Sequence, residues 1–130
     1  MDQRPAEILI IDDEGPLLKL MTVYLRRLGF TVTAANTLSK AWGHVKRRPG
    51  QFAVMVLDAG MAESGIDELV LQFLALQPHL QVVVNSGYPV DMRGLQGAAP
   101  GQVEFLHKPF SPEMLATAMR RILGPEEKDV

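Results

Sequence analysis

A short apolar run that ends in one carboxylate constrains the fold of this chain most strongly. Residues 52–57 read Phe-Ala-Val-Met-Val-Leu, and Asp58 follows them. Such a short, valine-rich run is typical of a strand buried on both faces, as in a parallel sheet. Asp58 then lies at the carboxyl end of a central strand, which is where ligands bind in open α/β sheets. A second run, residues 8–11, ends in the same way at Asp12 and Asp13.

Strand and helix patterns alternate along the rest of the chain. Further strands are expected at residues 30–34, 81–85 and 102–107, and a short, weakly indicated helix at residues 90–95. Two threonines alternate with apolar residues in the second strand, which indicates an edge position. Five strand–helix alternations predict an α/β fold, a doubly wound parallel sheet with right-handed crossovers.

Four longer helices are predicted from apolar residues that recur at helical spacing. The positions expected to face the core are Leu17, Met21, Tyr24, Leu25 and Leu28, then Leu38, Ala41, Trp42 and Val45, then Ile66, Leu69, Val70, Phe73 and Leu74, and finally Leu115, Ala118, Met119 and Ile122. Asn36 or Thr37 is expected to cap the second helix, and Ser111 is expected to cap the last one.

Composition is that of a globular protein with one domain. The 130 residues are 47% hydrophobic, contain no cysteine and carry a net charge of −2. This charge argues against direct nucleic-acid binding, and no apolar run approaches the roughly 20 residues that span a bilayer. Residues 1–5 lack the apolar core of a signal peptide. We therefore expect a cytoplasmic protein without membrane segments, with its domain over residues 1–125 and a solvated tail over residues 126–130.

Polar side chains follow four of the five predicted strands. Asp12 and Asp13 follow the first, Asp58 the third, Ser86 the fourth and Lys108 the fifth. Three clustered carboxylates repel one another, and Mg²⁺, a hard cation that prefers oxygen ligands and bridges to phosphate, offsets this repulsion. Lys108 supplies a point charge for a phosphoryl oxygen, and Ser86 supplies a hydroxyl donor. The set predicts phosphoryl transfer to Asp58 as the nucleophile.

In this order and spacing, the residues resemble the receiver domain of two-component response regulators, and the resemblance covers nearly all of the chain. It implies a flavodoxin-like fold, with five parallel strands in the order 2-1-3-4-5 and helices on both faces. Residues 86–89, Ser-Gly-Tyr-Pro, are similar to those of receivers attached to hybrid sensor kinases.

The resemblance also implies a role for each residue. Asp58 is the expected phosphoacceptor, Ser86 and Lys108 are expected to bind the phosphoryl group, and Phe105 matches the aromatic switch position that moves together with Ser86. The expected Mg²⁺ ligands are Asp12, Asp13, Asp58 and the backbone carbonyl of Gly60. The bond from Lys108 to Pro109 is usually cis in this family. Tyr88 is a candidate modulator, since its ring can shield the site or merely pack the turn.

The loop after Asp58 departs from the family pattern. Met61 keeps the usual spacing, but Ala62 stands where a proline is common. Gly65 follows Asp58 after seven residues instead of eight, so the loop is one residue short. This departure puts the rigidity and partner contacts of the loop in doubt more than its metal binding.

Each residue of the set has an ordinary explanation when it is taken alone. An Asp pair after a strand is typical of a solvated turn, and a lysine or serine next to a turn is typical of a surface position. Phe105 is expected in the core in either case. Only the combined spacing favours a site. The three histidines, His44, His79 and His107, are expected to be structural.

Two functions fit these observations. The first is a phosphorylation-dependent signalling switch, which accepts a phosphoryl group on Asp58 from a histidine kinase or phosphotransfer protein and acts on a downstream protein or output domain. It is not expected to be an enzyme beyond slow self-dephosphorylation. The second is a receiver-like interaction module that signals without phosphorylation, which the short loop favours. A homodimer and membership of a longer protein are left open.

Overall fold

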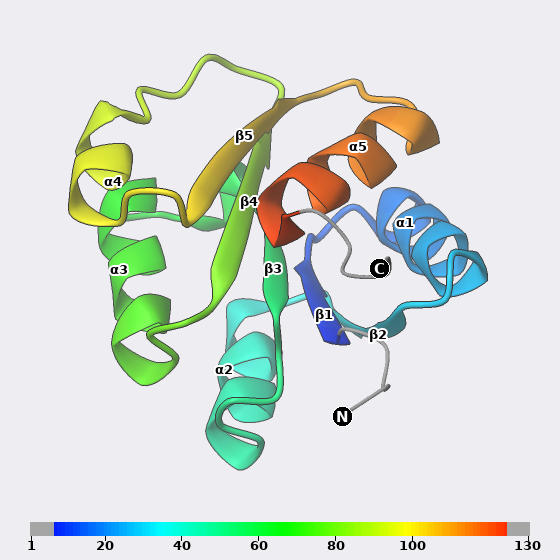
Figure 1. Cartoon of the computed structure of the whole chain (residues 1–130), viewed down its shortest axis with the longest axis horizontal. Coiled ribbons are helices and arrows are strands. Elements are labelled where there is room, and N and C mark those ends of the chain that lie inside the picture. The colour runs from blue at the N-terminus through cyan, green and yellow to red at the C-terminus, as the bar shows by residue number, and fades with distance from the viewer. Residues whose placement is uncertain (1–6, 125–130) are drawn as a thin grey trace.

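The computed structural model describes residues 7–124, which form a five-stranded parallel sheet between two layers of helices (Figure 1). The strands are β1 Glu7–Ile11, β2 Thr31–Ala35, β3 Val54–Asp58, β4 Gln81–Ser86 and β5 Val103–His107. Their order in the sheet is β2-β1-β3-β4-β5, and every neighbouring pair is parallel. The predicted doubly wound α/β fold and its strand order are therefore confirmed, with β2 at an edge.

Five α-helices and one short 3₁₀ helix connect the strands. They are α1 Gly15–Arg27, α2 Leu38–Arg47, η1 Ala59–Met61, α3 Ile66–Leu76, α4 Arg93–Ala98 and α5 Pro112–Leu123. Of the two cap candidates for α2, Thr37 is the cap, because its hydroxyl accepts the Lys40 N–H at 3.1 Å. Ser111 caps α5 as predicted, since its hydroxyl accepts the Met114 N–H at 3.1 Å.

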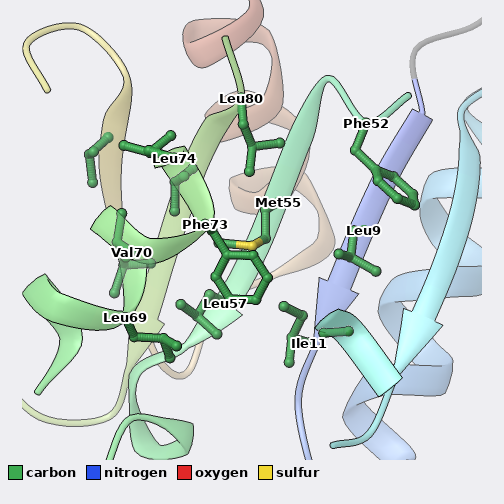
Figure 2. Close-up of a cluster of buried hydrophobic side chains, with 14 of the residues drawn as sticks. Leu9, Ile11, Phe52, Met55, Leu57, Leu69, Val70, Phe73, Leu74 and Leu80 are labelled. Carbon is green, nitrogen blue, oxygen red and sulfur yellow. The ribbon is translucent and has the colours of Figure 1, made fainter. Parts of the chain in front are cut away.

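The sheet separates two hydrophobic cores. Helices α2, α3 and α4 cover one face, and Figure 2 shows how Phe73 of α3 lies over Met55 and Leu57 of β3. The Phe73 ring stacks on Trp42 of α2, with centroids 3.8 Å apart and planes 6° from parallel. Helices α1 and α5 cover the other face, where they pack on alternate residues of the same strands. Val54–Leu57 of β3 are fully buried, because both faces of this strand are covered.

The buried face of α1 differs from the prediction. Leu18 and Thr22 are buried, whereas Leu17 is half-buried and Leu28 is 46% exposed. Thr22 tolerates burial because its hydroxyl donates to the Leu18 carbonyl at 2.7 Å. Leu28 lies beyond the last helical turn, where the chain turns away from the core through Gly29 at a φ of +100°. The helical stripe was therefore predicted about one position out of phase at its start and extended too far at its end.

The other element boundaries need smaller corrections. Strands β2 and β5 each begin one residue later than predicted, and the predicted helix at residues 90–95 is shifted to Arg93–Ala98. The Asp91 carboxylate accepts the Arg93 N–H at 3.1 Å, which favours a turn before the helix. Leu95, which is fully buried, holds α4 against the core. The predicted tail at residues 126–130 lies outside the described residues.

None of the helices within residues 7–124 combines the length and the apolar character that a membrane span requires.

The Phe73 side chain is expected to contribute strongly to stability. Phe73→Ala removes a fully buried ring from the stack on Trp42, so we expect the free energy of unfolding to fall by about 3–5 kcal/mol. Leu71→Ala on the same helix is a matched control, since Leu71 is 41% exposed and its loss should change stability by about 0.5 kcal/mol or less. Urea unfolding measures both values, and equal losses would contradict the core assignment.

Candidate functional site

Three carboxylates meet at the carboxyl edge of the sheet. Asp12 follows β1 and is fully buried, Asp58 ends β3 and is 9% exposed, and Asp13 is exposed. Each offers a carboxylate oxygen, and these three oxygens lie within 4.8 Å of one another. Asp12 and Asp58 are held by backbone N–H groups, because Glu14 donates to Asp12 Oδ1 at 2.8 Å and Gly60 donates to Asp58 Oδ1 at 3.2 Å. The convergence that the strand ends predicted is therefore present.

The three oxygens fit one hard divalent cation. Oxygens on opposite sides of Mg²⁺ lie about 4.2 Å apart, and those on opposite sides of Ca²⁺ lie about 4.6–5.2 Å apart. An upper limit of 4.8 Å on their separations is compatible with a shared cation of this kind. The Gly60 position leaves room beside the carboxylate, since a Cβ there would lie 3.6 Å from both oxygens of Asp58.

Lys108 brings one positive charge to this acidic group. Its backbone N–H donates to the Ser86 carbonyl at 2.8 Å, which continues the β4–β5 pairing, and its bond to Pro109 is cis, as expected. The ammonium Nζ lies 2.9 Å from Glu14 Oε1, 3.3 Å from Asp12 Oδ2 and 3.6 Å from Asp58 Oδ2. The ammonium therefore faces Oδ2 of Asp58, whereas Oδ1 of the same carboxylate accepts the Gly60 N–H.

The charges of the site shift the pKa values of its members. Burial raises the pKa of the Asp12 carboxyl, and the nearby charge of Asp58 raises it further, while the Glu14 N–H and the Lys108 ammonium only partly offset this. Burial lowers the pKa of the Lys108 ammonium, but its hydrogen bond to Glu14 and the charges of Asp12 and Asp58 outweigh burial and raise it overall. The site is therefore rich in negative charge that one ammonium does not balance.

Ser86 and Tyr88 follow β4 on the same edge. The Ser86 hydroxyl is buried and accepts the Tyr88 N–H at 2.9 Å, so its own proton remains available for donation to another oxygen. The Tyr88 side chain is 79% exposed. In this arrangement its ring extends into solvent rather than packing the turn, and the backbone rather than the ring contacts Ser86.

Phe105 lies apart from the acidic group. It is half-buried on β5 and packs against the core under α2, α3 and α4, with an edge contact to His107 at 6.2 Å between centroids. The prediction that Phe105 lies in the core is therefore only partly confirmed, because the residue is half-buried. Part of the ring lies against this core, and the rest is exposed to solvent.

The short loop after Asp58 is closed by a 3₁₀ turn. The Ala62 N–H donates to the Ala59 carbonyl at 3.1 Å, and Asp58 accepts at the start of the turn. Gly65 then begins α3 with a φ of +115°, a conformation that a side chain would strain. The 3₁₀ turn and the positive φ of Gly65 together define the path of the chain from Asp58 to α3.

Glu14 is a site residue that sequence reasoning missed. It makes the shortest contact of the Lys108 ammonium, although its side chain is 60% exposed. Its position two residues after Asp12 is visible in the sequence, but there it is interpreted as part of the turn that ends the first strand. Because the contact joins residues 94 positions apart, only the three-dimensional structure, which brings the chain after β1 and after β5 to the same edge of the sheet, reveals it.

Comparisons with known proteins agree with this geometry. The family model described as response regulator receiver domain matches residues 8–120. The DNA-binding transcriptional regulator NtrC of Azospirillum brasilense is 30% identical over 120 residues, which cover 92% of this chain and 24% of NtrC. The response regulator protein TodT of Pseudomonas putida is 28% identical over 131 residues, which cover 98% of this chain and 56% of TodT. The chain thus spans about a quarter to just over half of the length of these relatives.

Solved structures show the same fold. A response regulator receiver protein from Sinorhizobium medicae superimposes with a TM-score of 0.74 at 25% identity, covering 94% of this chain and 97% of its own. A response regulator from Burkholderia pseudomallei was solved with a phosphorylated aspartic acid and a calcium ion. It has a TM-score of 0.72 at 23% identity, and the match covers 88% of this chain and 66% of the Burkholderia chain. With strand order, edge carboxylates and family match in agreement, the chain belongs to the receiver domain family of response regulators.

Proposed function

We propose that this domain is a phosphorylation-controlled switch in which Asp58 accepts the phosphoryl group. The observation that carries the proposal is the convergence of three carboxylates and one ammonium around Asp58. In the proposed transfer, a carboxylate oxygen of Asp58 attacks phosphorus and forms an acyl phosphate. The bond from phosphorus to the donor histidine nitrogen breaks, and the electron pair returns to that nitrogen. The receiver domain family is one of phosphoacceptor signalling domains, which interact with histidine kinases or phosphotransfer proteins.

Magnesium is the proposed ion, held by Asp13, Asp58 and the Gly60 carbonyl with Asp12 assisting. When bound, it offsets negative charge that develops on the phosphoryl oxygens. Receiver domains bind a divalent metal at this acidic cluster, and the spacing of the carboxylate oxygens supports such a site here. Asp12 is buried and hydrogen-bonded, so its part is to fix the local charge and orientation.

Lys108 and Ser86 are the proposed phosphoryl-binding residues. The ammonium of Lys108 lies close enough to Asp58 to reach an added phosphoryl oxygen, and the Ser86 hydroxyl retains its proton for a second one. Movement of Ser86 toward the phosphoryl group leaves space beside β5, into which Phe105 turns from the core rim. The surface made by α4, β5 and α5 then changes as a shift between two packings.

Gly60 and Tyr88 are the residues that we expect to influence the lifetime of the phosphorylated state. Gly60 has no side chain, so the position two residues beyond Asp58 carries no acid or base, and we expect only slow self-dephosphorylation. Tyr88 is the proposed modulator, since its exposed side chain follows Ser86 closely enough to be drawn over the site. Its hydroxyl and ring would then restrict the approach of water.

The proposed partners follow from the family. A histidine kinase or phosphotransfer protein donates the phosphoryl group, and a downstream protein or output domain reads the switched surface. Residues 1–125 are the proposed receiver unit, and the relatives NtrC and TodT are named as regulators that are longer than this chain. Attachment to a hybrid sensor kinase, which residues 86–89 favour, and a homodimer are further possibilities for the assembly.

Phosphorylation of Asp58 is the direct test. Incubation with acetyl phosphate and magnesium should add the mass of one phosphoryl group to the wild type, because the carboxylate is a nucleophile paired with Lys108. Asp58→Asn removes the nucleophile and should abolish the mass increase, and chelation of magnesium should do the same. Intact-mass spectrometry measures all three. An unmodified wild type, or partner binding that is indifferent to phosphodonor and to Asp58→Asn, would instead support signalling without phosphorylation.

Glu14 should oppose phosphoryl binding. It holds the Lys108 ammonium at 2.9 Å, so a phosphoryl group has to compete with it for that cation. Beryllofluoride serves as a mimic of the phosphoryl group. We expect Glu14→Gln to lower the beryllofluoride concentration needed for half-saturation by about two- to fivefold, which corresponds to the interaction energy of a single partly exposed ion pair. Calorimetric titration in magnesium measures the effect. Glu104→Gln, which breaks a surface ion pair of the same 2.9 Å length with Arg121, should leave the affinity unchanged.

Asp12→Asn should stabilise the magnesium-free protein at neutral pH. Because burial raises the folded-state pKa of Asp12 above its usual 3.8, the ionised carboxylate opposes folding at every pH above the raised pKa. This effect fades as the pH falls toward 3.8, where folded and unfolded states both bind the proton. Urea unfolding in EDTA at several pH values measures the trend. A stabilisation that grows on acidification would refute this account. Asp91→Asn is a control of opposite sign, because hydrogen bonds from Arg93 lower the pKa of this exposed carboxyl, so the substitution should destabilise the protein at neutral pH and have less effect in acid.

A further inference from the structure

Asn85 is a buried polar side chain without a hydrogen-bond partner. It is fully buried on β4, and neither its Oδ1 nor its Nδ2 is hydrogen-bonded. A buried amide that is left unpaired destabilises the folded state, and each such group calls for an explanation. The three preceding residues, Val82–Val84, are apolar and fully buried, so the local environment does not demand an amide.

The register of the sheet places Asn85 beside the phosphoacceptor. Asn85 pairs with Asp58 on β3 and with Leu106 on β5. Side chains alternate along a strand, and Leu106 belongs to the core under α1 and α5, so Asn85 lies on that same face. Asp12, one residue beyond β1, continues this row. One row across the sheet therefore carries Asp12, Asp58, Asn85 and Leu106.

The Lys108 side chain extends in the direction of this row, from β5 toward β1. It begins one residue after β5, and its ammonium reaches Asp58 and Asp12 at the ends of β3 and β1. Because β4 lies between β5 and β3, the Lys108 side chain spans the end of β4, the strand that carries Asn85. Asn85 is therefore the register neighbour of a carboxylate whose Oδ1 already accepts the Gly60 N–H at 3.2 Å, and it lies on the strand that the Lys108 side chain spans.

We propose that Asn85 is a positioning residue for the phosphoacceptor, unpaired in the resting site and hydrogen-bonded to the Asp58 side chain once the site is occupied. This inference rests on the proposed function. Occupation draws the Lys108 ammonium toward the added oxygens and reorients the carboxylate, which gives the amide a partner within the same row. Asn85 then shifts the equilibrium toward the occupied state, because its unpaired amide destabilises the resting protein and its hydrogen bond stabilises the occupied one.

Thermal unfolding of the whole chain tests this, in EDTA and then with magnesium and beryllofluoride as the phosphoryl mimic. Asn85→Val should raise the melting temperature in EDTA by about 2–4 °C, because it removes an unpaired amide. The rise in melting temperature on adding magnesium and beryllofluoride should fall to half of the wild-type value or less. Asn85→Thr, which differs from valine by a hydroxyl in place of a methyl group, should recover part of that rise.

Gln77→Leu is the matched control. Gln77 is a second buried amide with an unpaired oxygen, but it lies at the end of α3, where its Nε2 donates to the Arg48 carbonyl. Its substitution should leave the ligand-induced rise unchanged.

Three results would overturn the inference, each in a wild type that does respond to the ligands. The first is a full ligand-induced rise in Asn85→Val. The second is a lower melting temperature of this variant in EDTA, which would mean that the amide is paired at rest. The third is an equal rise in the valine and threonine variants, which would assign the loss to packing. A wild type without any response would reject the proposed function itself.

Discussion

The unbalanced negative charge at the carboxyl edge of the sheet is the constraint on which the rest of the site depends. Buried strands β1 and β3 deliver Asp12 and Asp58 to one place, and Asp13 adds a third carboxylate beside them. Lys108 is the cation that reaches this group, and its contacts are divided between three acidic side chains. Such a site favours the binding of a cation. An anion alone would be repelled by the three carboxylates, so its binding depends on a cation that offsets their charge.

Each of the two hydrophobic cores supports a different group of residues on its own face of the sheet. The core under α1 and α5 supports the row of Asp12, Asp58 and Asn85, while the core under α2, α3 and α4 supports Phe105. Strand β4 belongs to both, because Asn85 and Ser86 are neighbours whose side chains lie on opposite faces. Strand β4 therefore connects the surroundings of Asp58 on one face with those of Phe105 on the other.

Sequence alone predicted the parts of this arrangement that depend on strand ends. Apolar runs identify the buried strands, and parallel strands share an edge, so Asp58 and Lys108 could be expected to meet from spacing alone. Glu14 and Asn85 were missed for a different reason. A polar residue in a turn or strand has many ordinary explanations, and only the three-dimensional contacts distinguish Glu14 beside Lys108 or leave Asn85 unpaired. The start of α4 was misplaced because its glycines weaken the local helical preference.

The stack of Trp42 on Phe73 has an optical consequence. Trp42 is the only tryptophan of the chain, so the intrinsic indole fluorescence has a single source. The indole borders a cavity of about 330 Å³ that Met61 and Gly65, from the short loop after Asp58, also line. Its emission therefore reports on the packing of that loop against α2 and α3. The native chain therefore carries its own spectroscopic probe beside the loop that follows Asp58.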